Sequence, residues 1–239
     1  MLVTNFNVKY VLYKVVCAFY QLADVGLIHP MRERSIRALN RTVDYIEESM
    51  PDALGFENQR ELTAYALKAA EVDGHYLEFG VFTGGTMRFI AARVGGRKVH
   101  GFDSFEGLPQ DWGGFNLGRR AFDVGGKLPR VPANVELHRG WFDDSLPQWL
   151  AANPGPVAFI HVDCDLYSST RTIFQSLGDR IVSGTVILFD EYFNYPNWEK
   201  HEFKAFQELV AERRMKYTYL GYARQQVVVR IDSVDGPAQ

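Results

Sequence analysis

Short apolar runs alternate with segments of helical periodicity over most of this chain, from residue 75 onward. Strands that alternate with helices form βαβ units, and such units build a mostly parallel sheet. We therefore predict an α/β fold. The predicted strands in this region are 75–81, 98–102, 134–138, 157–162 and 185–189, and the predicted helices are 86–94, 170–180 and 199–214. A further helix is predicted just before the first strand, at 58–71.

Two further strands are predicted near the end of the sequence, at 217–221 and 226–231. No helix fits between them, so they must pair as a hairpin, and the resulting seven-stranded sheet ends with an antiparallel C-terminal strand. Ligands of open α/β sheets bind beyond the carboxyl ends of the strands. The residues directly after each strand are therefore the candidates for a functional site.

Composition narrows the class of protein. The 239 residues suit one domain with an N-terminal extension, and 46% hydrophobic and 23% charged residues are typical of a globular chain. The net charge of -3, with basic residues only in short clusters, predicts no nucleic-acid partner. Two cysteines form neither a metal-ligand pattern nor a disulfide framework, which favours a reducing, cytoplasmic location.

The N-terminal region is apolar but does not predict a membrane span. Residues 3–28 are rich in apolar and aromatic side chains, yet Lys9, Lys14 and Asp24 interrupt the about 20 apolar residues that a spanning helix needs. No clean cleavage site of a signal peptide follows. We predict an amphipathic helix that packs on the domain or on a second subunit, with contact to a membrane surface as the alternative.

Helical periodicity continues over residues 31–50 and is stopped by Pro51. We therefore divide the chain into an N-terminal helical extension, residues 1–57, and a domain, residues 58–239. Exposed apolar surface usually marks an interface, so we predict a homo-oligomer that forms through the N-terminal region.

A long glycine-rich loop is predicted over residues 104–130, with Trp112, Phe115 and Phe122 in it. Long loops in compact domains are usually functional lids or disordered segments. The aromatic residues favour a lid that closes over a ligand, while a loose surface insertion is the alternative.

A glycine turn follows the first strand and opens a helix, in the sequence Glu78-Phe-Gly80-Val-Phe-Thr-Gly84-Gly85-Thr86. Glycines permit a sharp turn and a close approach of the backbone to a ligand. The helix that follows presents unpaired N–H groups. The spacing G-x-x-x-G-G differs from the dinucleotide pattern G-x-G-x-x-G. Taken alone, the turn is also compatible with a tight connection that binds nothing.

Carboxylates follow the later strands. Asp103 ends the second strand about 20 residues after the glycine turn, where an acid bonds ribose hydroxyls in nucleotide-binding folds. Asp163, Asp165, Asp190 and Glu191 follow the fourth and fifth strands. Clustered carboxylates need a cation or a shared proton, and oxygen ligands suit Mg²⁺, Ca²⁺ or Mn²⁺. The alternative for Asp103, Asp165 and Asp190 is that they cap helices.

These motifs, in this order, resemble class I S-adenosylmethionine-dependent methyltransferases, and more narrowly the macrocin O-methyltransferase family. The resemblance covers about residues 59–231 and implies a Rossmann-like, doubly wound fold. The residues that carry it are Tyr76–Thr86, Gly101–Pro109, Val162–Thr170 and Asp190–Tyr192.

The resemblance implies a cofactor, S-adenosylmethionine, and a role for each matching position. Asp103 would hold the ribose hydroxyls, Trp141 and Phe142 would lie along the adenine, and Asp143 would reach its amino group. The full set of implied cofactor residues is Glu78, Gly80, Gly84, Thr86, Asp103, Ser104, Trp141, Phe142, Asp143 and Asp163.

The resemblance also implies a divalent metal, with Mg²⁺ expected, held by Asp163, Asp190 and Glu191. The sequence departs from the family here, because the last ligand is more usually Asp or Asn. The implied reaction is methyl transfer to a hydroxyl of a small molecule, such as the sugar of a natural product. Asp163 is the first candidate for the base and His201 the second, whereas His161 is expected to be a core histidine.

Two other functions remain open at this point. The Asp163-Cys-Asp165 pair suits a metal-dependent glycosyltransferase that holds a nucleotide diphosphate. A cofactor-binding protein without transfer activity would carry the same motifs.

Overall fold

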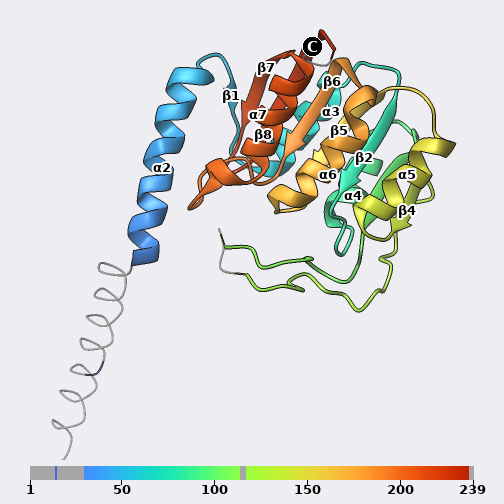
Figure 1. The fold of residues 1–239 in the computed structure, drawn as a ribbon, viewed down its shortest axis with the longest axis horizontal. Coiled ribbons are helices and arrows are strands. Elements are labelled where there is room, and N and C mark those ends of the chain that lie inside the picture. Colours follow the sequence, from blue (N-terminus) through green and yellow to red (C-terminus); the bar gives the residue numbers. More distant parts are fainter. Residues whose placement is uncertain (1–13, 15–29, 114–116, 237–239) are drawn as a thin grey trace, which may run out of the picture.

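The computed structural model describes residue 14 and residues 30–113 and 117–236. The predictions made for residues 3–28 therefore lie, apart from residue 14, outside the described part of the chain. One sheet with the strand order β1-β7-β8-β6-β5-β2-β3-β4 forms the centre of the molecule (Figure 1). Its strands are β1 Leu54–Gly55, β2 His75–Phe79, β3 Val99–Asp103, β4 Val135–Arg139, β5 Val157–Val162, β6 Ile181–Phe189, β7 Met215–Tyr222 and β8 Val227–Val234.

Helices cover both faces of this sheet. The helices α5, α6 and α7 pack side by side on one face, and α3 and α4 contact each other on the opposite face (Figure 1). Their bounds are α2 Pro30–Ser49, α3 Gln59–Ala69, α4 Gly85–Ala91, α5 Phe142–Ala152, α6 Tyr167–Leu177 and α7 Glu202–Arg213, with short 3-10 turns at Gly178–Arg180 and Trp198–Lys200.

The strand directions confirm the predicted mixed sheet. Every neighbouring pair is parallel except those of β8, which runs antiparallel to both β6 and β7. The C-terminal strand is thus the antiparallel one, and β7 and β8 form the expected hairpin.

The sheet has eight strands rather than seven, which corrects the prediction. The additional strand is β1, whose Leu54 pairs with Gly221 of β7. A strand of two residues is too short to show a periodic pattern of apolar residues, so the sequence does not predict it. It lies in the segment 1–57, and that segment is consequently not entirely helical.

Helix α5 was not predicted. Pro147 lies inside it, and a proline is normally a signal that a helix ends. The helix forms because its buried side, with Leu146 and Trp149, packs on the sheet. Burial of such side chains stabilises a fold by about 1.5–3 kcal/mol each.

Helix α2 lies at the β1 edge of the sheet and projects beyond it (Figure 1). On its inner side the ring of Tyr45 packs on Trp198 and Phe203, and the Thr42 hydroxyl accepts a hydrogen bond from the backbone N–H of Asn194, at 2.9 Å. Within the described residues, no helix is both long and apolar enough to cross a membrane.

Candidate active site

A cavity of about 810 Å³ opens at the carboxyl ends of the parallel strands. Gly80 follows β2, Asp103 ends β3, Asp163 follows β5 and Asp190 follows β6, and all four line this cavity. The position is the one expected for the ligand site of an open α/β sheet.

Gly80 brings two strand ends into close contact. Its φ is +94°, and a Cβ atom placed there would lie 1.6 Å from the carbonyl oxygen of Asp163. Its N–H donates to the carbonyl of Phe102, at 3.0 Å. Only glycine allows this turn, which therefore fixes the positions of Asp163 and Asp103 relative to each other.

The carboxylate of Asp103 holds the glycine turn from the other side. One oxygen accepts the backbone N–H groups of Val81 and Phe82, at 2.8 and 2.7 Å, and the other accepts the N–H of Phe105, at 2.6 Å. Asp103 caps no α-helix, because the chain after β3 enters the long loop. The same carboxylate lines the cavity and has lone pairs left for a ligand.

Three residues at the start of α5 line another part of the cavity. Trp141 is the N-cap residue and is 37% exposed, and Phe142 and Asp143 begin the helix. Phe142 packs its ring edge-on against Phe79 of β2, at 5.4 Å between centroids. The rings of Trp141 and Phe142 offer a flat apolar surface, and the carboxylate of Asp143 lies beside it.

Three carboxylates gather at the ends of β5 and β6. Asp163, Asp165 and Glu191 each place an oxygen within 4.8 Å of the others. Burial and the neighbouring Asp190 raise the pKa of all three, to about 7 for Asp165. One oxygen of Glu191 is buried with no hydrogen-bond partner among the described residues. Uncompensated carboxylates in this arrangement favour a bound cation.

Asp190, the third metal ligand implied by the sequence, is held differently. Its carboxylate accepts hydrogen bonds from the side-chain amides of Gln59 and Gln226. His161 Nε2 lies 3.5 Å from it. The structure thus groups Asp165, and not Asp190, with Asp163 and Glu191. Neither Asp165 nor Asp190 caps a helix, since the N-cap of α6 is Leu166.

His161 is a fully buried core histidine, as expected. Its Nδ1 lies 3.0 Å from a carboxylate oxygen of Glu78. Burial by itself would lower the pKa of His161, but Asp190 and Glu78 on either side of the ring raise it well above the usual value. The resulting positive charge offsets part of the buried negative charge next to the cavity.

The cavity includes most of the residues expected from the sequence and omits four. Glu78 is buried behind it and bonds His161. Gly84 and Thr86 belong to the start of α4, where Gly84 adopts a φ of +76° and caps the helix. His201 precedes α7, outside the lining. The predicted residues that do line it are Gly80, Asp103, Ser104, Trp141, Phe142, Asp143, Asp163, Asp190 and Glu191.

Sequence reasoning missed the residues that the long loop and the helix α6 contribute. The described part of 104–130 contains no helix or strand beyond a single bridge between Trp112 and Leu117, in agreement with the predicted loop. The spacing of Ser168, Ser169 and Thr172 after Asp165 is a usable signal for a lining face. The long loop also contributes Gly107, Leu108, Pro109, Trp112, Leu117, Arg119 and Phe122 to the lining, while Phe82 comes from the glycine turn and Gln225 from the turn between β7 and β8.

A doubly wound α/β domain with a glycine turn and an acid-lined cavity at its strand ends belongs to the Rossmann-like class. Comparison with known proteins then finds a match to a family. Residues 77–192 of the chain are similar to the family described as a methyltransferase domain. The matched segment contains the glycine turn, Asp103 and the three clustered carboxylates.

A curated relative from Streptomyces olivaceus is 34% identical in an alignment of 143 residues, and the match covers 51% of this chain and 54% of the relative. It is named 8-demethyl-8-(2,3-dimethoxy-alpha-L-rhamnosyl)-tetracenomycin-C 4'-O-methyltransferase. The chain thus spans about half the length of this relative.

Solved structures confirm the fold. The calicheamicin methyltransferase CalS11 has a TM-score of 0.61 and 22% identity, over 84% of this chain and 93% of that protein. The O-methyltransferase NovP has a TM-score of 0.56 and 24% identity, over 73% and 79% respectively. At these identities the likeness establishes the methyltransferase fold alone.

Proposed function

We propose that this protein is an S-adenosylmethionine-dependent O-methyltransferase that acts on a sugar hydroxyl of a glycosylated small molecule. The observation that carries the proposal is the acid-lined cavity at the strand ends, within the segment that matches the methyltransferase family. The curated relative, a 4'-O-methyltransferase of a rhamnosylated compound, supports the acceptor class. The family match favours this function over a glycosyltransferase.

The cofactor would occupy the side of the cavity between Gly80 and α5. Asp103 would accept the ribose hydroxyls, Trp141 and Phe142 would cover the adenine, and Asp143 would bond its amino group. The carboxylates of the cavity suit a ligand that carries a positively charged sulfonium. S-adenosylmethionine supplies the methyl group that is transferred.

The carboxylate cluster fits a divalent metal. Asp163, Asp165 and Glu191 offer only oxygen donors, and such a set suits Mg²⁺ or Ca²⁺. Asp190, which is already bonded by two amides, would support the cluster from the side. When bound, the metal would act as a Lewis acid that lowers the pKa of the acceptor hydroxyl and orients it.

The chain's own residues would position the acceptor and take its proton. Asp163 lies at the turn fixed by Gly80, so it is our first candidate for the base. The hydroxyl proton passes to the carboxylate while the oxygen forms its bond to the methyl carbon and the carbon–sulfur bond breaks. The loop 104–130 would exclude water.

Calorimetry with S-adenosylhomocysteine tests the cofactor assignment. We expect Asp103→Asn to lose about 1.5–3 kcal/mol of binding free energy, the contribution of a charge-assisted hydrogen bond. Asp144→Asn is the control, since Asp144 lies in the same region, outside the lining. Binding of nucleotide sugars without binding of S-adenosylhomocysteine would instead support a glycosyltransferase.

A methylation screen with glycosylated acceptors tests the activity and the metal. We expect transfer to an acceptor hydroxyl, its loss after exhaustive chelation, and its recovery with Mg²⁺. Asp165→Asn should abolish that recovery. Full activity of the chelated protein would refute the metal proposal. Cofactor binding without transfer to any of the acceptors would support the binding-protein alternative.

We also propose that residues 58–239 form the S-adenosylmethionine-dependent methyltransferase domain and that residues 1–57 are an extension of it. Gln59, at the start of α3, bonds Asp190 at the cavity, so the domain cannot begin later than this helix. The extension before it packs through α2 and β1 on the opposite edge of the sheet from β4.

A further inference from the structure

A second polar cluster lies away from the cavity, on strands β3 and β4. The strand register pairs His100 with Glu136 and Phe102 with His138, so the four side chains share one face of the sheet. This face is covered by α5. Neither histidine nor Glu136 lines the cavity, and β4 is the edge strand of the sheet.

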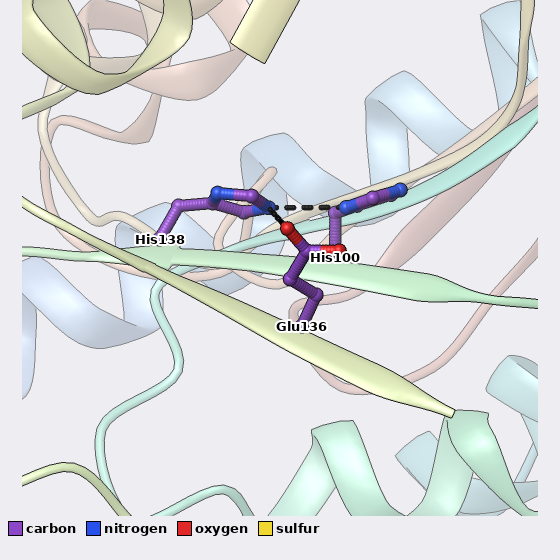
Figure 2. Close-up of side chains that lie close together, drawn as sticks. All are labelled: His100, Glu136 and His138. Atoms are coloured by element: carbon purple, nitrogen blue, oxygen red, sulfur yellow. Dashed lines mark hydrogen bonds and ion pairs between the residues drawn. The ribbon is translucent and has the colours of Figure 1, made fainter. Parts of the chain in front are cut away.

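The three polar side chains converge on one point. His100 Nδ1 lies 3.0 Å from His138 Nε2, and Glu136 Oε1 lies 4.0 Å from the same nitrogen (Figure 2). One ligand atom from each residue lies within 4.8 Å of the others. In a tetrahedral site with metal–nitrogen bonds of about 2.0–2.1 Å, two histidine nitrogens stand about 3.3 Å apart. The observed spacing therefore needs an adjustment of only a few tenths of an ångström.

The surroundings hold the rings and the carboxylate in this orientation. His138 stacks on Phe102, with 4.7 Å between centroids, and His100 packs its edge on Trp149, at 5.2 Å. Lys98 binds one oxygen of Glu136, at 3.0 Å, and the other oxygen turns towards His138. Ligand groups that are fixed by their neighbours in this way bind a metal with less loss of conformational entropy.

We propose that His100, Glu136 and His138 bind one transition-metal ion of the Zn²⁺ type at the outer edge of the sheet. Two imidazoles and one carboxylate suit Zn²⁺, Ni²⁺ or Cu²⁺, whereas Mg²⁺ prefers oxygen ligands alone. Glu136 is half-exposed, with 49% of its side chain accessible, so an ion has a path to the cluster and room for a water ligand.

A metal at this position would join the edge strand to its neighbour. β4 ends at Arg139 and leads through Gly140 to Trp141, which lines the cavity. The ion would thus stabilise the strand that positions the aromatic side of the active site. Because it would bind the folded chain alone, it would also raise the melting temperature.

Titration with Zn²⁺ in competition with a chromophoric chelator tests the proposal. We expect one high-affinity ion per chain, and at least about a 100-fold weaker affinity in His138→Gln, which removes a direct ligand. His75→Gln is the matched control, because His75 lies on the neighbouring strand, packs on His100 and is not part of the cluster. Asp165→Asn, in the active site, should leave this ion in place.

Co²⁺ in the wild-type chain gives a second measurement that needs no variant. Intense visible absorption from a tetrahedral site with nitrogen ligands would support the proposal even if His138→Gln failed to fold. A spectrum without the intense tetrahedral bands would overturn it. Loss of the ion in Asp165→Asn, or equal Zn²⁺ affinity in the wild type and a folded His138→Gln, would overturn it as well.

Discussion

At the scale of single residues, Gly80 has the closest contact at its Cβ position among the described glycines. Its positive φ disfavours any L side chain by about 1–2 kcal/mol, and a Cβ there would overlap the carbonyl oxygen of Asp163. We expect Gly80→Ala to lower the free energy of unfolding by more than this amount. Gly95→Ala is the control, because Gly95 also has a positive φ but no atom within 4 Å of its Cβ position. Equal losses in urea denaturation of the two variants would show that the contact with Asp163 is unimportant.

His100 makes stability depend on pH. Burial, together with the nearby His138, lowers the pKa of His100 from 6.5 to about 4, while Glu136 opposes this and His75 and Lys98 add to it. The unfolded chain thus takes up a proton at a higher pH than the folded chain does. The stabilising effect is complete above about pH 6.5 and is lost as the pH falls towards 4.

We therefore expect the free energy of unfolding to fall more steeply between pH 6.5 and 4 in the wild type than in His100→Gln. Urea denaturation of both proteins, in the presence of a chelator, measures the difference. Comparison of the two slopes cancels the contributions of the titrating groups that do not interact with His100. Parallel curves would contradict this assignment.

Residues that directly follow a predicted strand are found in the lining of the cavity. Gly80, Asp103 and Asp163 follow apolar runs, and they line the cavity as expected. The hydrogen-bond partners of each carboxylate, however, depend on contacts between residues that are far apart in the sequence. Asp190 accepts the amide of Gln59, 131 residues away, and no local pattern contains that information.

At the scale of elements, the loop 104–130 is the part that we expect to govern acceptor binding. Trp112 anchors it: its side chain is 3% exposed, packs on Leu108 and Leu166, and meets the ring of Tyr195 at 6.1 Å. The loop also contributes Leu117 and Arg119 to the cavity.

We expect Trp112→Ala to raise the KM for the acceptor on the order of tenfold, equivalent to about 1.4 kcal/mol, because the loop loses its anchor. The affinity for S-adenosylhomocysteine should stay unchanged, since the proposed cofactor side of the cavity lies next to α5. Leu128→Ala is the control, as Leu128 lies in the same loop, 54% exposed. A loss of cofactor-product affinity that matches the loss for the acceptor would refute this role.

The predictable elements are those whose local pattern agrees with their tertiary environment. β5 has the predicted bounds, because all six of its residues are buried. β6 begins four residues earlier than its apolar run, at Ile181. Gly184, with a φ of +90°, interrupts that pattern, and the register with β5 shifts at the same place. The packing of α5 on the sheet outweighs the destabilising effect of the proline inside this helix. A prediction from local sequence patterns does not include such tertiary packing.

At the scale of the whole molecule, the two edges of the sheet differ. On one side β4 carries the histidine cluster, and on the other side β1 and α2 close the sheet against β7. The inner side of α2 packs on the domain, whereas its outer side leaves Ile36, Leu39 and Val43 exposed by 43%, 47% and 43%. These three residues recur at helical spacing and form one apolar stripe.

This stripe is where we expect the predicted self-association to occur. An apolar helix face in water gains free energy when a second copy covers it, and a symmetric dimer lets each α2 cover the other. Light scattering of the full chain should give twice the mass of one chain. The double variant Leu39→Glu, Val43→Glu should give the mass of one chain, because dimerisation would bury four unpaired carboxylates. Glu48→Lys is the matched control, since Glu48 is exposed on another side of α2. A monomeric wild type would reject the homo-oligomer, and an unchanged mass in the double variant would place the interface elsewhere.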